Sequence, residues 1–461
     1  MTGANDTIVA VATPPGQGGV AIVRLSGPQA ERILHQIFYP KGKGRTTPWP
    51  SHCLTLGWVG APDHPVDEAM AALMRAPRSY TREDVAEVHC HGAPWAVRET
   101  VRLAMEAGAR PAEPGEFTRR AFENGRIDLA QAEAVMALVG AQGEGAARDA
   151  LRQMRGGVSK IALEARAGVV RLLAGVEAAL DFPEEIGERE ATAGLREGGL
   201  ALAASLRAAC DPRAEKLLRE GLDVVIAGRP NVGKSTLLNA LLGEQRAIVT
   251  DLPGTTRDTL TERLVIGGLV VQLTDTAGLR EGGDAIDAAE AIGVARAREA
   301  LERADVGLIV LDASAPLTSE DEALLAEPCG QARIVVLNKC DLQQCTMYNV
   351  QCTNGGGGAA RVVRVSALTG QGVPELLDAL RGLAALPGGG DAAFTRARHI
   401  AAATQAAEAL EEAVAALDAG LPADMAAIDL RRALDALGAI TGETLSEDVI
   451  DAIFANFCVG K

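Results

Sequence analysis

Aromatic residues are scarce in this 461-residue chain, where Phe, Trp and Tyr together make up only 3%. Long stretches rich in Ala, Leu, Glu and Arg are present instead, and these residues favour helices. No run of 18 or more apolar residues occurs, so we expect no membrane-spanning helix. Residues 1–13 lack the basic start and the apolar stretch of a secretory signal, so we expect a cytosolic protein.

An excess of positive charge is missing as well. The formal net charge is −16, which argues against indiscriminate nucleic-acid binding, because such binding depends on clustered Lys and Arg. The net charge does not exclude an RNA partner that binds to a local patch or through another subunit. The eight cysteines form no disulfide-like framework. Two groups match no zinc spacing, so we expect no metal at His89, Cys90 and His91 or at Cys340, Cys345 and Cys352.

Changes of sequence pattern divide the chain. The first part mixes short β-prone runs with helical stretches, and its segment 84–89 alternates polar and apolar residues as a half-buried strand does. A helical pattern follows from Asp128, which can cap a helix together with Gln131 three residues on. An α/β segment then interrupts the helical pattern, which resumes afterwards and continues to the end. We therefore expect four segments, 1–124, 125–220, 221–385 and 386–461.

A phosphate-binding loop occurs at 228–235, directly after a buried-strand pattern and directly before a helical one. Glycines let the backbone N–H groups surround phosphate oxygens, and the helix N-terminus adds a favourable potential. Lys234 would neutralise the β- and γ-phosphates, and the hydroxyl of Ser235 would bind Mg²⁺. The nucleotide-binding residues expected here are Asn231, Val232, Gly233, Lys234, Ser235 and Thr236.

Three further motifs follow later strand patterns in the order typical of a GTPase. In the first, Asp275 can hold Mg²⁺ through water and Gly278 can sense the γ-phosphate. In the second, Asp341 can accept hydrogen bonds from two guanine N–H groups, which adenine does not offer. All the motifs follow strands, so they meet at one edge of an open parallel sheet. They predict a Ras-like GTP-hydrolysing domain that uses Asp275, Thr276, Ala277 and Gly278; Asn338, Lys339, Cys340 and Asp341; and Ser366, Ala367 and Leu368.

A switch segment is expected between the phosphate loop and the second motif. Thr256 is the candidate for the second side-chain ligand of Mg²⁺, and segments of this kind become ordered around the γ-phosphate. The expected nucleotide contacts in it are Thr250, Asp251, Leu252, Pro253, Gly254, Thr255 and Thr256.

Motifs outside the nucleotide site are more specific. They lie at 5–10, 24–27, 79–81, 114–118, 128–133 and 457–461. Together with the GTPase motifs they resemble the tRNA modification GTPase MnmE (TrmE) family over almost the whole chain. The fold class predicted on these grounds is α/β plus all-α, with an N-terminal folate-binding α/β domain, a discontinuous helical domain and an inserted P-loop G domain.

The resemblance implies a reaction as well as a fold. Such proteins hydrolyse GTP and act with an FAD-containing partner, MnmG (GidA), in a heterotetramer, so FAD is expected on the partner and not on this chain. Together they modify C5 of the wobble uridine, position 34, of certain tRNAs to carboxymethylaminomethyl- or aminomethyl-uridine. The one-carbon unit comes from 5-formyl-tetrahydrofolate or a related folate, bound by an N-terminal domain that also forms a homodimer.

Individual roles follow from the same resemblance. Folate would be bound by Arg24, Glu87, Arg126 and Lys461, although plain salt bridges for the arginines and a solvated Glu87 are alternatives. A potassium ion would take the place of an arginine finger, held by Asn231, Thr250, Leu252 and Thr255.

Two further residues are catalytic candidates by the resemblance. Glu290 would orient the attacking water, with Asp287 as a rival and an ordinary surface carboxylate as the alternative. Cys458 would take part in the modification, or would be a small packing residue. The stretch before it predicts a helix that docks the tail against the folate domain or the helical core through Val449, Ile450, Ile453, Phe454 and Phe457.

Two other functions compete with this reading. A GTPase switch in ribosome assembly, without chemistry on a base, usually carries an RNA-binding module after the G domain. Here Ala- and Leu-rich helical sequence follows instead, and no Gly-x-x-Gly RNA loop occurs. A folate-dependent one-carbon transferase acting alone would leave the intact G domain unexplained.

Overall fold

The computed structural model describes residues 6–41, 49–181, 188–244, 261–266, 269–275, 299–327, 332–342, 361–384 and 394–460. It divides into two compact units. The first unit contains Met1–Met136, Gln153–Ala203 and Gln405–Lys461, and the second contains Ala137–Arg152 and Ala204–Thr404. None of the helices in the described ranges combines the length and apolarity that a bilayer crossing requires.

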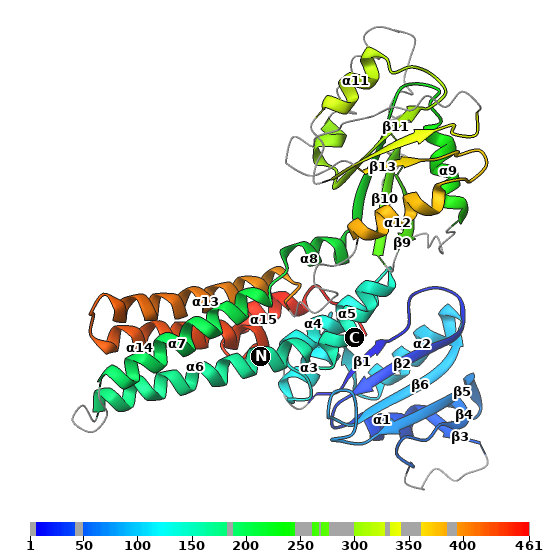
Figure 1. Ribbon diagram of the computed structural model, residues 1–461. Coiled ribbons are helices and arrows are strands. Elements are labelled where there is room, and N and C mark those ends of the chain that lie inside the picture. Colours follow the sequence, from blue (N-terminus) through cyan, green and yellow to red (C-terminus); the bar gives the residue numbers. More distant parts are fainter. Residues whose placement is uncertain are drawn as a thin grey trace. The chain divides into compact units, whose positions relative to one another are not determined.

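A seven-stranded sheet in the order β3-β4-β5-β6-β2-β1-β7 forms the N-terminal part of the first unit (Figure 1). Helices α1 (Ala30–Ile37) and α2 (Pro94–Glu106) pack on one face of it. The strands are β1 (Ile8–Val11), β2 (Gly18–Ser26), β3 (Phe38–Pro40), β4 (Thr55–Ala61), β5 (His64–Met74), β6 (Val85–Gly92) and β7 (Arg110–Pro111).

Alternation along the central strands decides which side chains face the helices. On β6, Val88 is fully buried in the core, whereas its neighbours Glu87 and His89 lie on the opposite face and are partly exposed. On β2, Val23 and Leu25 are buried and Arg24 between them is not. The strand predicted from the alternation at 84–89 is therefore confirmed.

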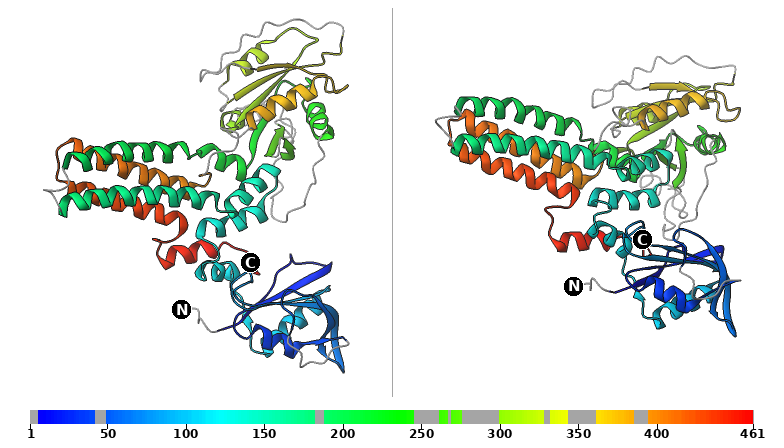
Figure 2. Two further views of the ribbon diagram at one scale, coloured as in Figure 1. Left: turned by 60° about the horizontal axis from the view of Figure 1, so that its bottom comes forward. Right: turned by 90° about the horizontal axis from the view of Figure 1, so that it is seen from below.

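Helices make up the rest of the first unit. In Figures 1 and 2 the long helices α6, α7, α13 and α14 lie side by side. Close packing depends on small residues, because Gly168 on α6 leaves room for Leu202 on α7, and Gly199 on α7 leaves room for Val414 on α13. The described helices that follow the N-terminal sheet in the first unit are α3 (Glu116–Glu123), α4 (Leu129–Gly140), α6 (Gly157–Asp181), α7 (Glu188–Ala208), α13 (Ala397–Asp418), α14 (Ala423–Thr441) and α15 (Glu447–Phe454), some of which extend into the second. Helices α5 (Glu144–Met154) and α8 (Pro212–Arg219) lie wholly or mostly in the second unit.

The start of α4 confirms the capping prediction. The backbone N–H of Gln131 donates to Asp128 Oδ1 at 2.9 Å, and the N–H of Asp128 donates to Gln131 Oε1 at 3.0 Å. This reciprocal pair satisfies two N–H groups that a helix start otherwise leaves unpaired.

A six-stranded sheet in the order β13-β12-β11-β8-β10-β9 forms the centre of the second unit. All neighbouring strands are parallel except β9 and β10. Helices α9 (Lys234–Glu244) and α12 (Val373–Ala384) pack on one face, and α11 (Ser319–Ala326) packs on the other. The strands are β8 (Leu222–Ala227), β9 (Thr261–Ile266), β10 (Leu269–Asp275), β11 (Val306–Asp312), β12 (Ala332–Asn338) and β13 (Arg361–Arg364).

The chain passes into and out of this α/β fold at adjacent points. Cys210 and Phe394 form a parallel β-bridge, in which the N–H of Asp211 donates to the carbonyl of Phe394 at 3.1 Å. Phe394 is fully buried. Close termini are what an inserted domain requires, and the combination of an α/β sheet domain, helices and a second α/β fold confirms the predicted fold class.

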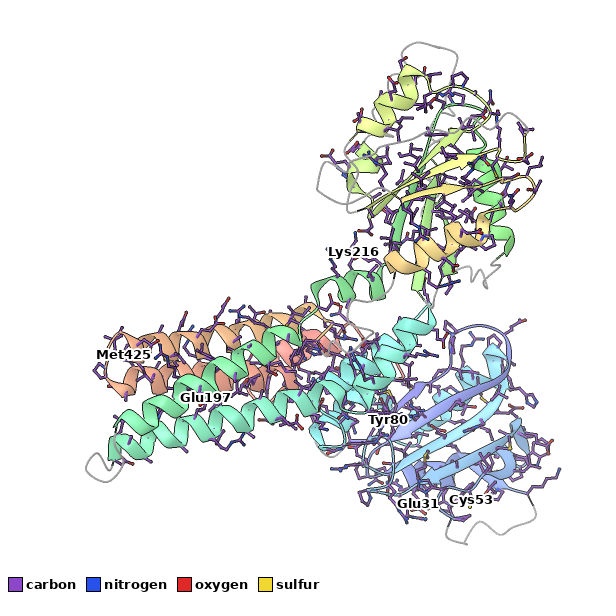
Figure 3. The ribbon with its side chains drawn as sticks, in the orientation of Figure 1. Glu31, Cys53, Tyr80, Glu197, Lys216 and Met425 are labelled. Carbon is purple, nitrogen blue, oxygen red and sulfur yellow. The ribbon has the colours of Figure 1, made fainter. Side chains whose placement is uncertain are left out.

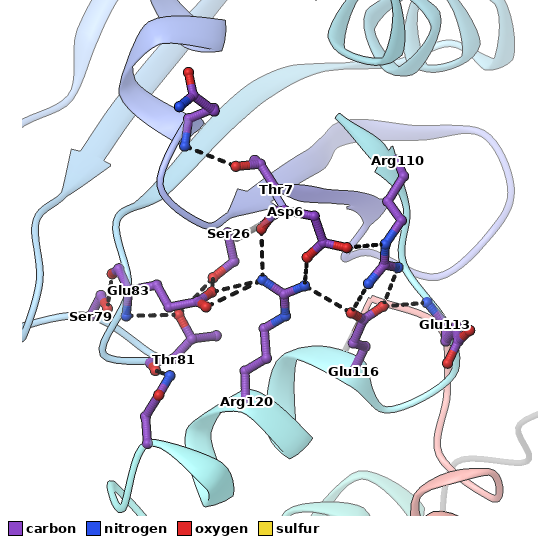
Figure 4. Close-up of polar contacts among 12 residues, drawn as sticks. Asp6, Thr7, Ser26, Ser79, Thr81, Glu83, Arg110, Glu113, Glu116 and Arg120 are labelled. Carbon is purple, nitrogen blue, oxygen red and sulfur yellow. Dashed lines mark hydrogen bonds and ion pairs between the residues drawn. The ribbon is translucent and has the colours of Figure 1, made fainter. Parts of the chain in front are cut away.

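A buried ionic network joins segments of the N-terminal domain that are distant in sequence (Figure 4). Arg120 on α3 contacts Asp6 Oδ1 at 2.6 Å, Glu116 at 2.9 Å and Glu83 at 3.2 Å. Arg110 on β7 contacts the other oxygen of Asp6 at 2.5 Å and Glu116 Oε2 at 2.8 Å. The network therefore ties the start of β1 and β7 to the first turn of α3.

The two arginines set the ionisation of this network. Burial alone would raise the pKa of Asp6 and of Glu116, but hydrogen bonds from Arg110 and Arg120 outweigh it and lower the pKa of both carboxyls. A folded-state pKa below the unfolded value stabilises the fold above the unfolded pKa, which is 3.8 for Asp6 and 4.5 for Glu116. This contribution is lost as the pH falls from there through the folded-state values.

We expect Arg120→Met to lower the free energy of unfolding by about 3 kcal/mol at pH 7, because the buried Glu116 and the partly buried Asp6 and Glu83 each lose a charged hydrogen-bond donor. Urea titration followed by tryptophan fluorescence measures this selectively, since the three tryptophans, Trp49, Trp58 and Trp95, all lie in the N-terminal domain. The loss should shrink as the pH falls below the unfolded-state pKa values and through the lowered folded-state values, because protonated carboxyls no longer attract the arginine. Arg102→Met is the control, since Arg102 also meets two carboxylates but lies exposed on α2; an equal loss there, or a pH-independent one, would contradict the prediction.

Candidate functional site

The phosphate loop joins the end of β8 to the start of α9. Lys234 is only 6% exposed, and its ammonium group donates to the carbonyls of Gly228 and Arg229, both at 2.9 Å. Asn231 has a φ of 64°, a left-handed conformation in which a short polar residue is tolerated. The lysine ammonium is thus held inside the loop whose backbone would surround a phosphate chain.

Asn338 braces the loop from the end of β12. Its Nδ2 donates to the carbonyl of Val232 at 2.8 Å, and its Oδ1 accepts from the backbone N–H of Ala367 at 3.0 Å. A side chain at Gly233 would overlap the same amide group, so the glycine provides the space for this contact. One buried carboxamide therefore fixes the phosphate loop, the Asn-Lys-x-Asp motif and the Ser366–Leu368 segment relative to one another.

The next residues of that motif lie on a braced backbone at the same edge of the sheet. Lys339 contacts Asp312 Oδ2 at 2.6 Å; burial would raise the pKa of Asp312, but this contact and that of Ser314 lower it, so the carboxylate stays charged. The N–H of Cys340 donates to the carbonyl of Val365 at 3.2 Å. Asp341 and Leu368 are exposed at this edge of the sheet. An exposed carboxylate on a braced backbone can accept two guanine N–H groups.

Only some of the residues expected to bind magnesium lie within the described ranges. Ser235 lies exposed on the first turn of α9, and the strand register places the backbone of Asp275 beside Ile226 at the end of β8. A hydroxyl after the loop lysine and an aspartate on the neighbouring strand fit magnesium chemistry. Other expected residues lie outside the described residues: Thr250, Asp251, Leu252, Pro253, Gly254, Thr255, Thr256, Thr276, Ala277, Gly278, Asp287, Glu290 and Lys461. Within the described ranges, no three His, Cys, Asp or Glu side chains cluster as a metal site.

Three of the expected folate residues come together in the N-terminal domain. Arg24 and Glu87 are cross-strand partners on β2 and β6, and Arg24 Nε lies 2.8 Å from Glu87 Oε1. The other oxygen of Glu87 lies 3.2 Å from His89 Nε2. Both side chains of the Arg24–Glu87 pair keep some exposure, so a ligand can reach a carboxylate and a guanidinium side by side.

Tyr80 links this pair to Arg126. Its ring centroid lies 5.6 Å from Cζ of Arg24 and 4.7 Å from Cζ of Arg126, within the range of cation–π attraction. Arg126 also donates to the carbonyl of Tyr80 at 2.9 Å, and the Tyr80 hydroxyl lies 2.9 Å from that of Thr118 on α3. In Figure 3, Tyr80 lies where the sheet adjoins the helices that follow it.

Sequence reasoning missed Tyr80 as a contact of the two arginines. The motif 79–81 was a signal, because it contributes to the family resemblance, but no pattern in the sequence indicates what its tyrosine touches. Phe117, in the motif 114–118, was missed in the same way and lies 5.8 Å from Cζ of Arg24.

The C-terminal tail is anchored by phenylalanines. Phe454 and Phe457 are buried with Leu129 and Ala132, and partly buried Ile450 and Ile453 pack against them. This confirms four of the five residues expected on the packed face. Val449 was wrongly placed there, because it is 42% exposed; the buried positions 450, 453, 454 and 457 follow one helical face, and 449 falls beside it. Cys458 is exposed, and its carbonyl accepts from the N–H of Gly115 at 3.3 Å.

Known proteins resemble the chain over almost its full length. Residues 7–126 match the family described as the GTP-binding protein TrmE N-terminus, and residues 129–458 match the MnmE helical domain. The tRNA modification GTPase MnmE of Heliobacterium modesticaldum is 45% identical over 470 aligned residues, which cover 99% of each protein. The one from Geobacillus kaustophilus is 46% identical, again over 99% of each.

One solved structure resembles part of the chain. The G domain of the T. maritima FeoB iron transporter is 30% identical over 35% of this chain and 98% of that domain, with a TM-score of 0.27, too low for a structural argument. The family matches and the full-length relatives are decisive. The chain belongs to the MnmE family of tRNA modification GTPases.

Proposed function

We propose that this GTPase uses potassium-activated GTP hydrolysis to drive modification of the wobble uridine of certain tRNAs. With the FAD-containing MnmG (GidA), in a heterotetramer in the cytosol, it converts C5 of uridine 34 to a carboxymethylaminomethyl or aminomethyl derivative. The carbon comes from 5-formyl-tetrahydrofolate or a related folate. The observation that carries the folate part is the joining of Arg24, Glu87 and Arg126 through Tyr80 in one cluster.

The nucleotide part follows from the braced loop. Lys234 would move from the loop carbonyls to the β- and γ-phosphates, Ser235 and Thr256 would hold Mg²⁺, and Asp341 would select guanine. Bound K⁺ would offset the charge that develops between the phosphates. Its ligands would be Asn231, Thr250, Leu252 and Thr255, of which Asn231 has a left-handed backbone. Glu290 would orient the water, with Asp287 as its rival.

The folate part follows from complementary charge. Glu87 would accept from the N–H edge of the pterin, while Arg24, Arg126 and Lys461 would meet carboxylates. The partly exposed Tyr80 ring beside the two arginines favours a flat aromatic ligand at this place. Cys458 would serve the one-carbon chemistry from the neighbouring tail.

A homodimer would form through the open face of the N-terminal sheet. Leu56 on β4 pairs in register with Met70 on β5, and Met70 pairs with His89 on β6. Leu56, Met70 and the neighbouring Trp58 are large apolar side chains that stay exposed. This row lies on the face opposite α1 and α2 and leads to the Arg24–Glu87 pair. Apolar rows of this kind favour burial against an identical surface.

The function is tested by mass-spectrometric nucleoside analysis of tRNA incubated with the protein, MnmG, GTP, K⁺ and 5-formyl-tetrahydrofolate. Arg24→Gln should weaken folate binding about tenfold to a hundredfold, since a bond to a charged group contributes about 1.5–3 kcal/mol. The modified uridine should fall accordingly, with GTP hydrolysis unchanged. Arg32→Gln, an exposed arginine on α1, is the control. If the Arg24→Gln variant modified tRNA fully, the proposal that folate binds at this site would be wrong.

Potassium should accelerate GTP hydrolysis about tenfold or more over sodium, which corresponds to about 1.4 kcal/mol of transition-state stabilisation. Turnover measured in KCl and in NaCl at equal ionic strength tests this. Asn231→Ala should abolish the difference between the salts while nucleotide affinity stays nearly unchanged. Equal rates in both salts for the unsubstituted protein would exclude K⁺ from the site.

Met70→Lys should weaken the dimer at least tenfold, because it places a charge in an apolar interface. Sedimentation equilibrium of the full chain measures the dissociation constant. Met105→Lys is a matched control: Met105 is 42% exposed and Met70 40%, but Met105 lies on α2, on the other side of the sheet. Equal dimerisation of both variants would exclude the open face as the interface.

A further inference from the structure

Gly115 lies where no side chain fits. A Cβ atom there would lie 2.7 Å from Phe457 Cβ and 2.8 Å from the carbonyl of Phe454, closer than any real Cβ contact. Its backbone N–H also donates to the carbonyl of Cys458 at 3.3 Å. The backbone of the C-terminal tail therefore lies directly against the bare Cα of this glycine.

Both the turn that contains Gly115 and the tail that packs against it are held in place by other contacts. The turn before α3 is held because Glu116 accepts from Arg110, from Arg120 and from the N–H of Glu113 at 2.9 Å. Figure 4 shows these contacts converging on Glu116. On the other side, Phe454 and Phe457 are buried with ring centroids 5.0 Å apart. A methyl group at Gly115 would thus push the tail away.

Gly460 makes a second contact of the same kind. A Cβ atom there would overlap the carbonyl of Val11, the last residue of β1. The residue before it on β1, Ala10, is the cross-strand partner of Arg24. The tail is therefore seated against the strand next to the one that carries Arg24.

We propose that Gly115 is a positioning residue for the modification reaction. Because it has no side chain, it leaves a recess in which residues 458–460 lie beside the Arg24–Glu87 pair. This rests on the proposed function, in which Cys458 and Lys461 act at that pair. The role is steric. This steric requirement is separate from the requirement for a left-handed backbone conformation. Other glycines of the domain share the second requirement with Gly115.

Gly125 separates these two explanations. Its φ is 66° and that of Gly115 is 69°, so an alanine is strained equally at both positions. A Cβ at Gly125 would meet only Arg82 Nη1 at 3.6 Å, an ordinary contact. The two glycines also flank the same helix, α3. Gly125→Ala therefore reproduces the backbone cost of Gly115→Ala without the collision.

The test is hydrogen exchange of C-terminal peptides by mass spectrometry in the full-length protein. In Gly115→Ala, the amides of Ala455 and Phe457, which donate to Asp451 and Phe454, should exchange at least tenfold faster than in Gly125→Ala. The modified uridine should fall at least tenfold as well, while GTP hydrolysis stays unchanged. Gly460→Ala, compared with Gly420→Ala, where a Cβ would meet nothing, should lower modification in the same way even if Gly115→Ala folds poorly.

Unchanged exchange of the tail in Gly115→Ala, or equal effects in Gly125→Ala, would overturn the proposal. A released tail with full modification would overturn the part that Gly115 plays in the reaction. Failure of the proposed function is seen separately, because the unsubstituted protein would then yield no modified uridine although its tail is protected from exchange.

Discussion

The nucleotide edge of the second unit depends on the carboxamide of Asn338. A parallel sheet brings the ends of its strands to one edge, but the loops that follow are free to diverge. Asn338 prevents this by bonding Val232 and Ala367 at once. Because the amide is 2% exposed, an unsatisfied donor or acceptor there would be costly. The segments proposed to bind phosphate and to select the base are therefore held in one geometry by this side chain.

Arg120 has a similar structural role in the N-terminal domain, where one side chain joins several segments. It is 9% exposed and meets three carboxylates from three segments, so its contacts fix where α3 begins. From that helix Thr118 reaches the hydroxyl of Tyr80, and Tyr80 in turn faces Arg24 and Arg126. From the turn before it, Gly115 faces the tail. The proposed folate cluster and the proposed seat of Cys458 are thus two sides of one ionically fixed helix start.

The sequence predicted those features that depend on residues close together in the chain. The capping pair Asp128–Gln131 and the alternating strand at 84–89 rest on residues a few positions apart, and both were confirmed. The phosphate loop was placed in the same way, because glycines, lysine and serine must occur at fixed spacing. The contacts of Arg120 with Asp6, 114 positions away, and of Tyr80 with Arg24 have no such spacing. Only the folded sheet brings these residues together. The sequence therefore shows each residue within its own motif but does not show which distant residue it contacts.

The role proposed for Cys458 needs a fixed backbone and open access, and the tail provides both. Phe457 is buried, Cys458 is exposed and Gly460 is buried again, so anchors lie on each side of the thiol. Larger residues at the anchoring glycines would have kept the backbone away from the domain by the width of a side chain. Because Gly115 and Gly460 have none, the backbone of the tail contacts the domain directly at these two points, in addition to the packing of Phe454 and Phe457, and the Cys458 side chain stays exposed.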